Sequence, residues 1–267
     1  MTDARQKIIN KLKKVEEEYD VKVLYAVESG SRVWGFNNSD SDYDVRFIYK
    51  SNNLKDYLRL NPPEDVIRFT RVDWDTFDFE GWDIRKMLKL HYKNNPSLYE
   101  WSKNLNPYIG AENYKELFFD LPSFDKVGLQ HHYKSMALTT YNKHVAEKSA
   151  DDLKVLKKLL QVIRCILCFR VLFTFDEYPE LNFNALMEQA EVDDEYKVMF
   201  SEMQRLYVNK KDLSQTEDAK LFPLINTWIG CELRDLQKTY PNGSKTYKDL
   251  EVYDQKFYDI VVDGVLD

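Results

Sequence analysis

Two short motifs near the N-terminus combine residue types that phosphoryl chemistry uses. Gly30-Ser31 is followed, after ten residues, by Asp42-x-Asp44. Side chains two apart on a strand share a face, so Asp42 and Asp44 are expected side by side. Adjacent carboxylates repel unless a cation lies between them, and hard divalent cations prefer oxygen ligands. A Gly-Ser turn at a helix start offers backbone N–H groups and a hydroxyl to an anion. The pair predicts a metal site next to a phosphate cradle.

An isolated Asp-x-Asp is more often a solvated turn in which aspartates cap backbone amides. The strand-like Tyr43 and Val45 favour the metal interpretation. A two-metal site also needs a third carboxylate, which ligates and activates the attacking hydroxyl. We predict Asp78 for this role, with Glu80 as the alternative, since both fall on the polar face of the strand expected over residues 75–80. Other carboxylates lie nearby in the sequence: Asp73, Asp75 and Asp83.

These residues require strands and turns that bring them together. Apolar and β-branched runs predict strands over residues 21–27, 43–49, 65–72 and 75–80. A short helix around Arg32-Val33-Trp34 and a short crossover are expected to join the first two. An amphipathic helix is predicted over residues 7–18, and further helices over residues 54–60 and 97–103. Gly81 is expected to end the sheet, with a helix from Trp82 onward.

After Pro107 the strand signals fade and helical periodicity dominates. Helices are predicted over residues 126–148, 151–174, 184–190, 193–209 and 215–238. The predicted fold class is therefore α+β. An N-terminal α/β domain with a mixed sheet, residues 1–107, precedes an all-α helical domain, residues 108–267.

The spacing of the two motifs resembles the Gly-Ser…Asp-x-Asp signature of the DNA polymerase beta nucleotidyltransferase superfamily. Longer segments are similar to the YcgL group of predicted nucleotidyltransferases, which includes the RNA-repair-associated RlaP proteins. The resemblance covers the first hundred residues, continues thinly through 132–137 and the Arg164 helix, and fades after about Phe175. The matching segments are 29–36, 39–46, 81–86, 95–96 and 100–101.

This resemblance implies roles for particular residues. Gly30 and Ser31 would bind the β- and γ-phosphates of an NTP, and Asp42 and Asp44 would ligate two Mg²⁺ ions, with Mn²⁺ as an alternative. Asp78 would complete the metal site nearest the acceptor and help to deprotonate its hydroxyl. The reaction would transfer an NMP to an RNA end, a protein or a small molecule, with release of pyrophosphate. The N-terminal domain would be the catalytic one.

Four basic residues have both a functional and a structural interpretation. Arg32 and Arg46 flank the carboxylates and either steer the NTP or balance local charge. Arg164 lies in an apolar helix, where a buried guanidinium needs a partner, either a carboxylate or the triphosphate. Lys134 either contacts a phosphate or solvates a helix face. We predict nucleotide binding by Arg32, Lys134 and Arg164.

Composition limits the remaining possibilities. No run of about 20 apolar residues is present, so no membrane segment is expected, and the sequence favours a cytoplasmic protein. Residues 1–110 carry 18 basic and 18 acidic residues and the remainder 20 and 27, so no broad basic surface for duplex nucleic acid is expected. Cys165 and Cys168 are expected to pack in a core. The alternative to catalysis is a nucleotide-binding or regulatory module, such as a toxin–antitoxin component.

Overall fold

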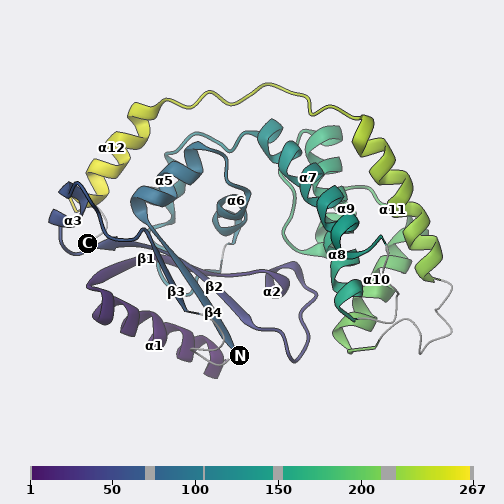
Figure 1. Ribbon diagram of the computed structural model, residues 1–267, viewed down its shortest axis with the longest axis horizontal. Helices are drawn as coiled ribbons and strands as arrows, with labels where there is room; N and C mark the ends of the chain where they lie inside the picture. The colour runs from purple at the N-terminus through teal and green to yellow at the C-terminus, as the bar shows by residue number, and fades with distance from the viewer. Residues whose placement is uncertain (1, 70–75, 105, 147–152, 212–220, 265–267) are drawn as a thin grey trace. The chain divides into compact units, whose positions relative to one another are not determined.

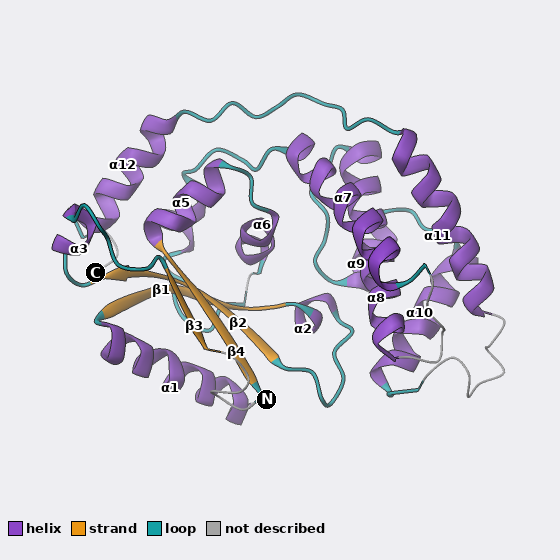
Figure 2. Cartoon of the chain, viewed as in Figure 1, coloured by secondary structure: helices purple, strands orange, loops and turns teal. Residues whose placement is uncertain are grey.

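The computed structural model describes residues 2–69, 76–104, 106–146, 153–211 and 221–264. Its four strands form one mixed sheet in the N-terminal part, and helices dominate the C-terminal half (Figure 2). The predicted α+β fold class is confirmed. The strands are β1 (Val21–Ser29), β2 (Tyr43–Ser51), β3 (Val66–Phe69) and β4 (Phe77–Asp83).

The described helices follow the predicted positions closely, with three additions. The predicted ones are α1 (Thr2–Tyr19), α2 (Ser31–Trp34), α3 (Lys55–Leu58), α5 (Ile84–Tyr92), α6 (Pro96–Lys103), α7 (Lys126–His144), α8 (Leu153–Arg170), α9 (Phe183–Gln189), α10 (Asp194–Val208) and α11 (Leu221–Lys238). The sequence did not indicate the π-helix η1 (Lys115–Phe119) or α12 (Leu250–Val261), and the end of the predicted helix over 151–174 is a π-helix, η2 (Val171–Phe175).

By packing, the chain divides into two compact units. The first unit comprises Met1–Arg32, Asp42–Phe124 and Thr246–Asp267, and the second comprises Val33–Ser41 and Asp125–Lys245. These limits differ from the boundary expected near residue 107, because the first unit continues to Phe124 and includes α12. Packing units need not be independently folding domains, so the division into domains at residue 107 stays a prediction.

The sheet of the first unit has the strand order β1-β2-β4-β3. Its central strands β2 and β4 are parallel, whereas β1 pairs with β2 and β3 pairs with β4 in antiparallel fashion. The expected crossover between the first two strands is therefore wrong, because antiparallel neighbours need only a return connection. Helix α1 covers one face of the sheet, and α5 and α6 cover the other (Figure 1).

Strand β4 is longer than the sequence indicated. Gly81 does not end the sheet but pairs with Phe47 of β2, and a Cβ atom on Gly81 would lie 2.1 Å from the Phe47 ring. The glycine thus makes room for a ring on the neighbouring strand. Trp82 remains in the strand, and α5 begins at Ile84, where the Asp83 side chain caps it by accepting a hydrogen bond from Arg85 N at 2.8 Å.

Helix α12 is attached to the first unit by buried polar contacts with α5 and β2. His91 of α5 hydrogen-bonds the Tyr253 hydroxyl at 2.9 Å, and Lys248 Nζ donates to the His91 carbonyl at 2.6 Å. Lys50 Nζ of β2 donates to the Ile260 carbonyl at 3.2 Å. These contacts join residues more than 150 positions apart, so local sequence patterns gave no sign of them.

His91 is expected to make stability depend on pH. Burial, with a further contribution from the nearby Lys248 charge, lowers the pKa of His91 from its usual 6.5 to about 3. Between these values the unfolded chain binds a proton that the folded chain does not, so stability falls as the pH falls from about 6.5 toward 3. At pH 5 the loss is about 2 kcal/mol relative to pH 7.

Urea unfolding at pH 7 and pH 5 tests this effect. The His91→Gln variant keeps a hydrogen-bonding side chain that does not titrate, so its loss of stability between the two pH values should be about 2 kcal/mol smaller than that of the wild type. Equal losses in the two proteins would contradict the prediction.

The second unit is helical, and α7 and α8 pack side by side in it (Figure 1). Helix α8 is buried along most of its length, including Cys165 and Cys168, which are 1% and 0% exposed. Their burial among apolar side chains fits the predicted core role. Within the described ranges, no helix combines the length and apolarity that crossing a bilayer requires.

Candidate active site

Gly30 occupies the turn between β1 and α2 in a conformation that favours glycine. Its φ is +66°, in the left-handed region, and a Cβ atom there would lie 2.3 Å from Asp44 Oδ2. Ser31 follows as the first residue of α2 and is 5% exposed. The Gly-Ser turn therefore lies directly against an Asp44 carboxylate oxygen, so the two predicted motifs meet.

Asp44 and Asp78 occupy matched positions on the two central strands. In the parallel pair β2–β4, Asp44 is the register partner of Asp78, so the two side chains lie on the same face of the sheet. Both are partly exposed, at 30% and 36% of their side-chain surface. Asp42 lies immediately before β2 and is half-buried. Strand β2 begins at Tyr43, as predicted, so Asp42 precedes the strand whose alternation was expected to place it beside Asp44.

The Arg46 guanidinium joins Asp44 and Asp78. Its Nη2 atom lies 3.2 Å from Asp44 Oδ1 and 3.1 Å from Asp78 Oδ2, and Nη1 donates to the Asp78 carbonyl at 3.1 Å. One cation thereby lies between two carboxylates that would otherwise repel each other. Of the two interpretations offered for Arg46, this geometry supports charge balance.

Glu80 shares a strand face with Asp78 but has other partners. Its carboxylate accepts from Arg68 of β3 at 2.5 Å and from Trp82 Nε1 at 2.9 Å. The opposite face of β4 carries Phe77 and Phe79, which are buried as predicted. The register partner of Asp44 is Asp78, so the geometry favours Asp78 as the third carboxylate.

Glu28, near the end of β1, is a site residue that the sequence analysis missed. Its Oε1 accepts from Asp44 N at 2.8 Å, and its Oε2 accepts from the Tyr108 hydroxyl. Burial raises the pKa of the Glu28 carboxyl to about 7, the hydrogen bonds from Tyr108 and Asp44 oppose this rise, and the Asp44 charge adds to it. The available signal was a lone carboxylate in an otherwise apolar strand, directly before Ser29-Gly30.

A family model described as the RNA repair pathway DNA polymerase beta family, RlaP, matches residues 4–259. The chain belongs to the RlaP family. It is also similar to the uncharacterized protein YcgL of Bacillus subtilis (strain 168), with 31% identity over 250 residues, which is 92% of each chain. The family match reaches residue 259 and so extends well beyond Phe175, where the sequence resemblance was expected to fade.

Three basic residues were expected to bind the nucleotide in this RlaP member. Arg32 Nε donates to the Asp42 carbonyl at 3.0 Å, and its guanidinium carbon lies 3.7 Å from the centre of the Tyr43 ring. Arg32 therefore holds the start of β2 in place beside the carboxylates. This placement puts a cation next to the Gly-Ser turn, and direct contact with a phosphate stays a prediction.

Lys134 and Arg164 belong to the second compact unit. Lys134 Nζ donates to the carbonyls of Thr239 at 2.7 Å and Gln237 at 3.3 Å, near the end of α11. Arg164 is 2% exposed, and its guanidinium carbon lies 4.5 Å from the centre of the Trp34 ring. Both side chains thus have structural contacts within their own unit, and their predicted phosphate contacts stay predictions.

The donor set at the carboxylates suits a hard cation. Among the described residues, no three carboxylate, imidazole or thiol groups lie close enough together to hold a metal ion as they stand. Asp42, Asp44 and Asp78 nevertheless supply only oxygen donors, which Mg²⁺ and Mn²⁺ prefer. Arg46 contacts one oxygen of Asp44 and one oxygen of Asp78.

Substitution of Gly30 by alanine is expected to damage this site. The methyl group would clash with the Asp44 carboxylate, and left-handed φ costs a non-glycine residue about 1–2 kcal/mol. Gly230→Ala in α11 is a matched control, because nothing lies within 4 Å of the added Cβ. Denaturant unfolding should show Gly30→Ala destabilised by about 1–3 kcal/mol and Gly230→Ala unchanged or stabilised by up to about 1 kcal/mol. Equal stability of the two variants would contradict the steric account.

Proposed function

We propose that the protein is a metal-dependent nucleotidyltransferase that moves an NMP from an NTP to an acceptor hydroxyl. The observation that supports this most directly is the meeting of three features on one sheet. Asp44 and Asp78 are register partners on parallel strands, and the Gly30 turn packs against Asp44. A turn that presents backbone N–H groups beside paired carboxylates suits a bound metal–triphosphate. Membership of a DNA polymerase beta family is consistent with this chemistry.

In this proposal each residue has a distinct task. The backbone of Gly30 and Ser31 binds the β- and γ-phosphates, while Asp42, Asp44 and Asp78 would hold Mg²⁺. When bound, Mg²⁺ supplies positive charge that stabilises the attacking and leaving oxygens. Asp78 takes the proton of the acceptor hydroxyl while the oxygen of that hydroxyl forms a bond to the α-phosphorus. The bond between the α-phosphorus and the bridging oxygen breaks, and pyrophosphate leaves.

Arg46 and Glu28 prepare the carboxylates for this reaction. Arg46 holds Asp44 and Asp78 close together, because its guanidinium contacts both carboxylates. Glu28 fixes the backbone of Asp44, because its carboxylate accepts the Asp44 N–H at 2.8 Å. Fixed carboxylate positions reduce the reorganisation needed when the ion and the triphosphate bind.

The acceptor is proposed to be an RNA end, in keeping with the RNA repair description of the family. The test incubates the protein with each α-labelled NTP and Mg²⁺ or Mn²⁺, and offers RNA, DNA, protein and small-molecule acceptors in parallel. Label should appear in RNA. Label in protein or in a small molecule would show that RNA is not the acceptor, while the proposed NMP transfer would stand. Nucleotide binding with no transfer to any acceptor would instead support the non-catalytic module.

A further inference from the structure

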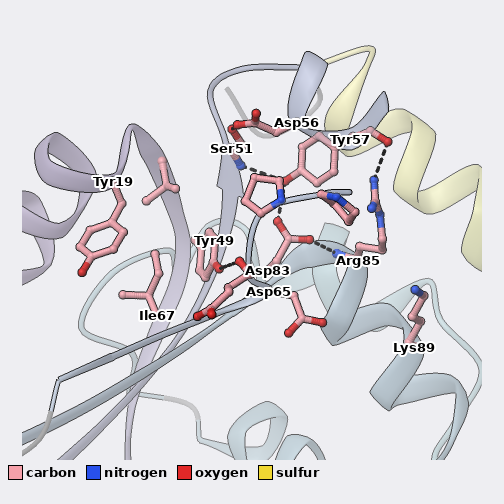
Figure 3. Close-up of a pocket in the computed structure, with 14 residues that line it drawn as sticks. Tyr19, Tyr49, Ser51, Asp56, Tyr57, Asp65, Ile67, Asp83, Arg85 and Lys89 are labelled. Atoms are coloured by element: carbon pink, nitrogen blue, oxygen red, sulfur yellow. Dashed lines mark hydrogen bonds between the residues drawn. The ribbon is translucent and has the colours of Figure 1, made fainter. Parts of the chain in front are cut away.

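A cavity lies in the first unit, at the other end of β2 from the carboxylates. It has a volume of about 200 Å³ and is bounded by the ends of α1 and β2, by α3, by the start of β3 and by α5 (Figure 3). Asp44 and Tyr49 are five positions apart on β2, which is roughly 17 Å along a strand. None of the predicted catalytic or nucleotide-binding residues lines the cavity, so it is separate from the candidate active site.

Aromatic side chains form much of the wall. Tyr19, Tyr49 and Tyr57 line the cavity from three different elements, together with Pro62, Pro63 and Ile67 (Figure 3). Tyr49 and Ile67 are buried, at 4% and 5% exposure, whereas Tyr19 lies at the surface at 43%. Tyrosine rings attract cations to their faces, and several rings around one hollow form the usual binding site for ammonium groups.

One wall is fixed by a chain of hydrogen bonds. Ser51 N donates to the Tyr57 hydroxyl, which donates to Asp83 Oδ2, and Arg85 N donates to Asp83 Oδ1, each at 2.8 Å (Figure 3). Asp83 is only 8% exposed and is held between α3 and α5. A wall held in this way loses little conformational entropy when a ligand binds.

The charge lining the cavity is predominantly negative. Two basic residues, Arg85 and Lys89, face four carboxylates: Asp56, Glu64, Asp65 and Asp83. Arg85 already has partners, since it donates to the Tyr57 carbonyl at 2.8 Å. Its guanidinium carbon lies 5.0 Å from the centre of the Tyr57 ring and 5.3 Å from the centre of the Phe257 ring. Lys89 is exposed at the rim.

The negative charge of the carboxylates raises the pKa of two tyrosines that line the cavity. Burial raises the pKa of Tyr49, and the charges of Asp83, Asp65 and Glu64 raise it further. Burial and then the charge of Asp83 raise the pKa of Tyr57. Two of the carboxylates have basic partners outside the cavity, Asp65 with Lys86 at 2.7 Å and Asp56 with Arg59 at 3.5 Å. Asp65 and Arg59 are more than half exposed in these pairs, so the pairs screen the lining only weakly.

We propose that this cavity binds a small organic cation, an amine or ammonium compound. The rings of Tyr19 and Tyr49 provide aromatic surface for the ligand, and Glu64, Asp65 and Asp83 provide the negative potential. A volume of about 200 Å³ is below that of drug-sized sites, so the ligand has a small number of heavy atoms. The proposal concerns a site outside the nucleotidyl-transfer centre and does not depend on that activity.

Calorimetric titration of the full-length protein with three five-carbon probes tests the charge assignment. The probes are 1,5-diaminopentane, the neutral 1,5-pentanediol and the anionic glutarate. The diamine should bind at least tenfold more tightly than either of the others, and tenfold more NaCl should weaken it severalfold. Equal binding of the diol, tighter binding of glutarate, or no binding of the diamine would each overturn the proposal.

Two variants and a control locate the site. Glu64→Gln/Asp65→Asn changes exposed carboxylates and should weaken diamine binding about tenfold, whereas Glu112→Gln, an exposed carboxylate outside the cavity lining, should not. Tyr19→Ala removes an exposed ring and should weaken binding about threefold to fivefold. This variant tests the site even if the double variant folds poorly. Unchanged binding in both variants would contradict a site in this cavity.

Discussion

Substitution of Asp44 by asparagine is expected to lower NMP transfer by a factor of about 10²–10³. Asparagine has nearly the same shape, so it fits beside Gly30 and in register with Asp78. It removes the negative charge that would hold the metal ion and through it the triphosphate. The measurement is the steady-state rate of label transfer from an α-labelled NTP at saturating Mg²⁺.

The control for this variant is Asp3→Asn, which removes a carboxylate that is 81% exposed on α1. Its rate should equal that of the wild type. Unfolding curves should show Asp44→Asn folded, because Arg46 retains its contact with Asp78. A folded Asp44→Asn protein that transfers NMP at the wild-type rate would contradict the assignment of Asp44 to the active site.

The pair Asp78→Asn and Glu80→Gln should separate the two candidates for the third carboxylate. Asp78 is the register partner of Asp44 and shares the Arg46 guanidinium with it, so Asp78→Asn should lower transfer by a factor of about 10²–10³. Glu80 pairs with Arg68 and Trp82, so Glu80→Gln should change the transfer rate by no more than about threefold. The same assay measures both.

A reversed order, with Glu80→Gln inactive and Asp78→Asn active, would make Glu80 the third carboxylate. The two variants each lose one negative charge from the same face of β4, so a general electrostatic effect would lower both rates alike.

The local features of the candidate site could be predicted because they follow from spacing. Alternation along a strand placed Asp78 and Glu80 opposite Phe77 and Phe79, and the buried rings bear this out. Alternation cannot choose between Asp78 and Glu80, which share a face. That choice depends on the register of β4 against β2, which places Asp78 rather than Glu80 beside Asp44.

Other features depend on contacts between distant parts of the chain. The pairing of β1 with β2 is antiparallel, and a short connection with a helix in it is compatible with more than one topology. The Tyr108–Glu28 contact joins residues 80 positions apart, and α12 reaches His91 from 162 positions away. The steric need for Gly30 also appears only when Asp44 is placed against it.

Residue type alone leaves two roles open for Arg46. A basic residue two positions after an aspartate predicted to bind metal suggests either steering of the nucleotide or charge balance. The structure places the Arg46 guanidinium within 3.2 Å of both Asp44 and Asp78, which supports charge balance.

The central claim is that the protein breaks the bond between the α- and β-phosphates of an NTP. The most direct measurement compares two mixtures of the four NTPs, labelled at the α- or at the γ-phosphate, each with Mg²⁺ and RNA. We expect α-label to be joined to RNA and γ-label to appear in pyrophosphate, and we expect neither product without Mg²⁺. Transfer of γ-label to RNA, or transfer that continues without a divalent metal, would contradict it.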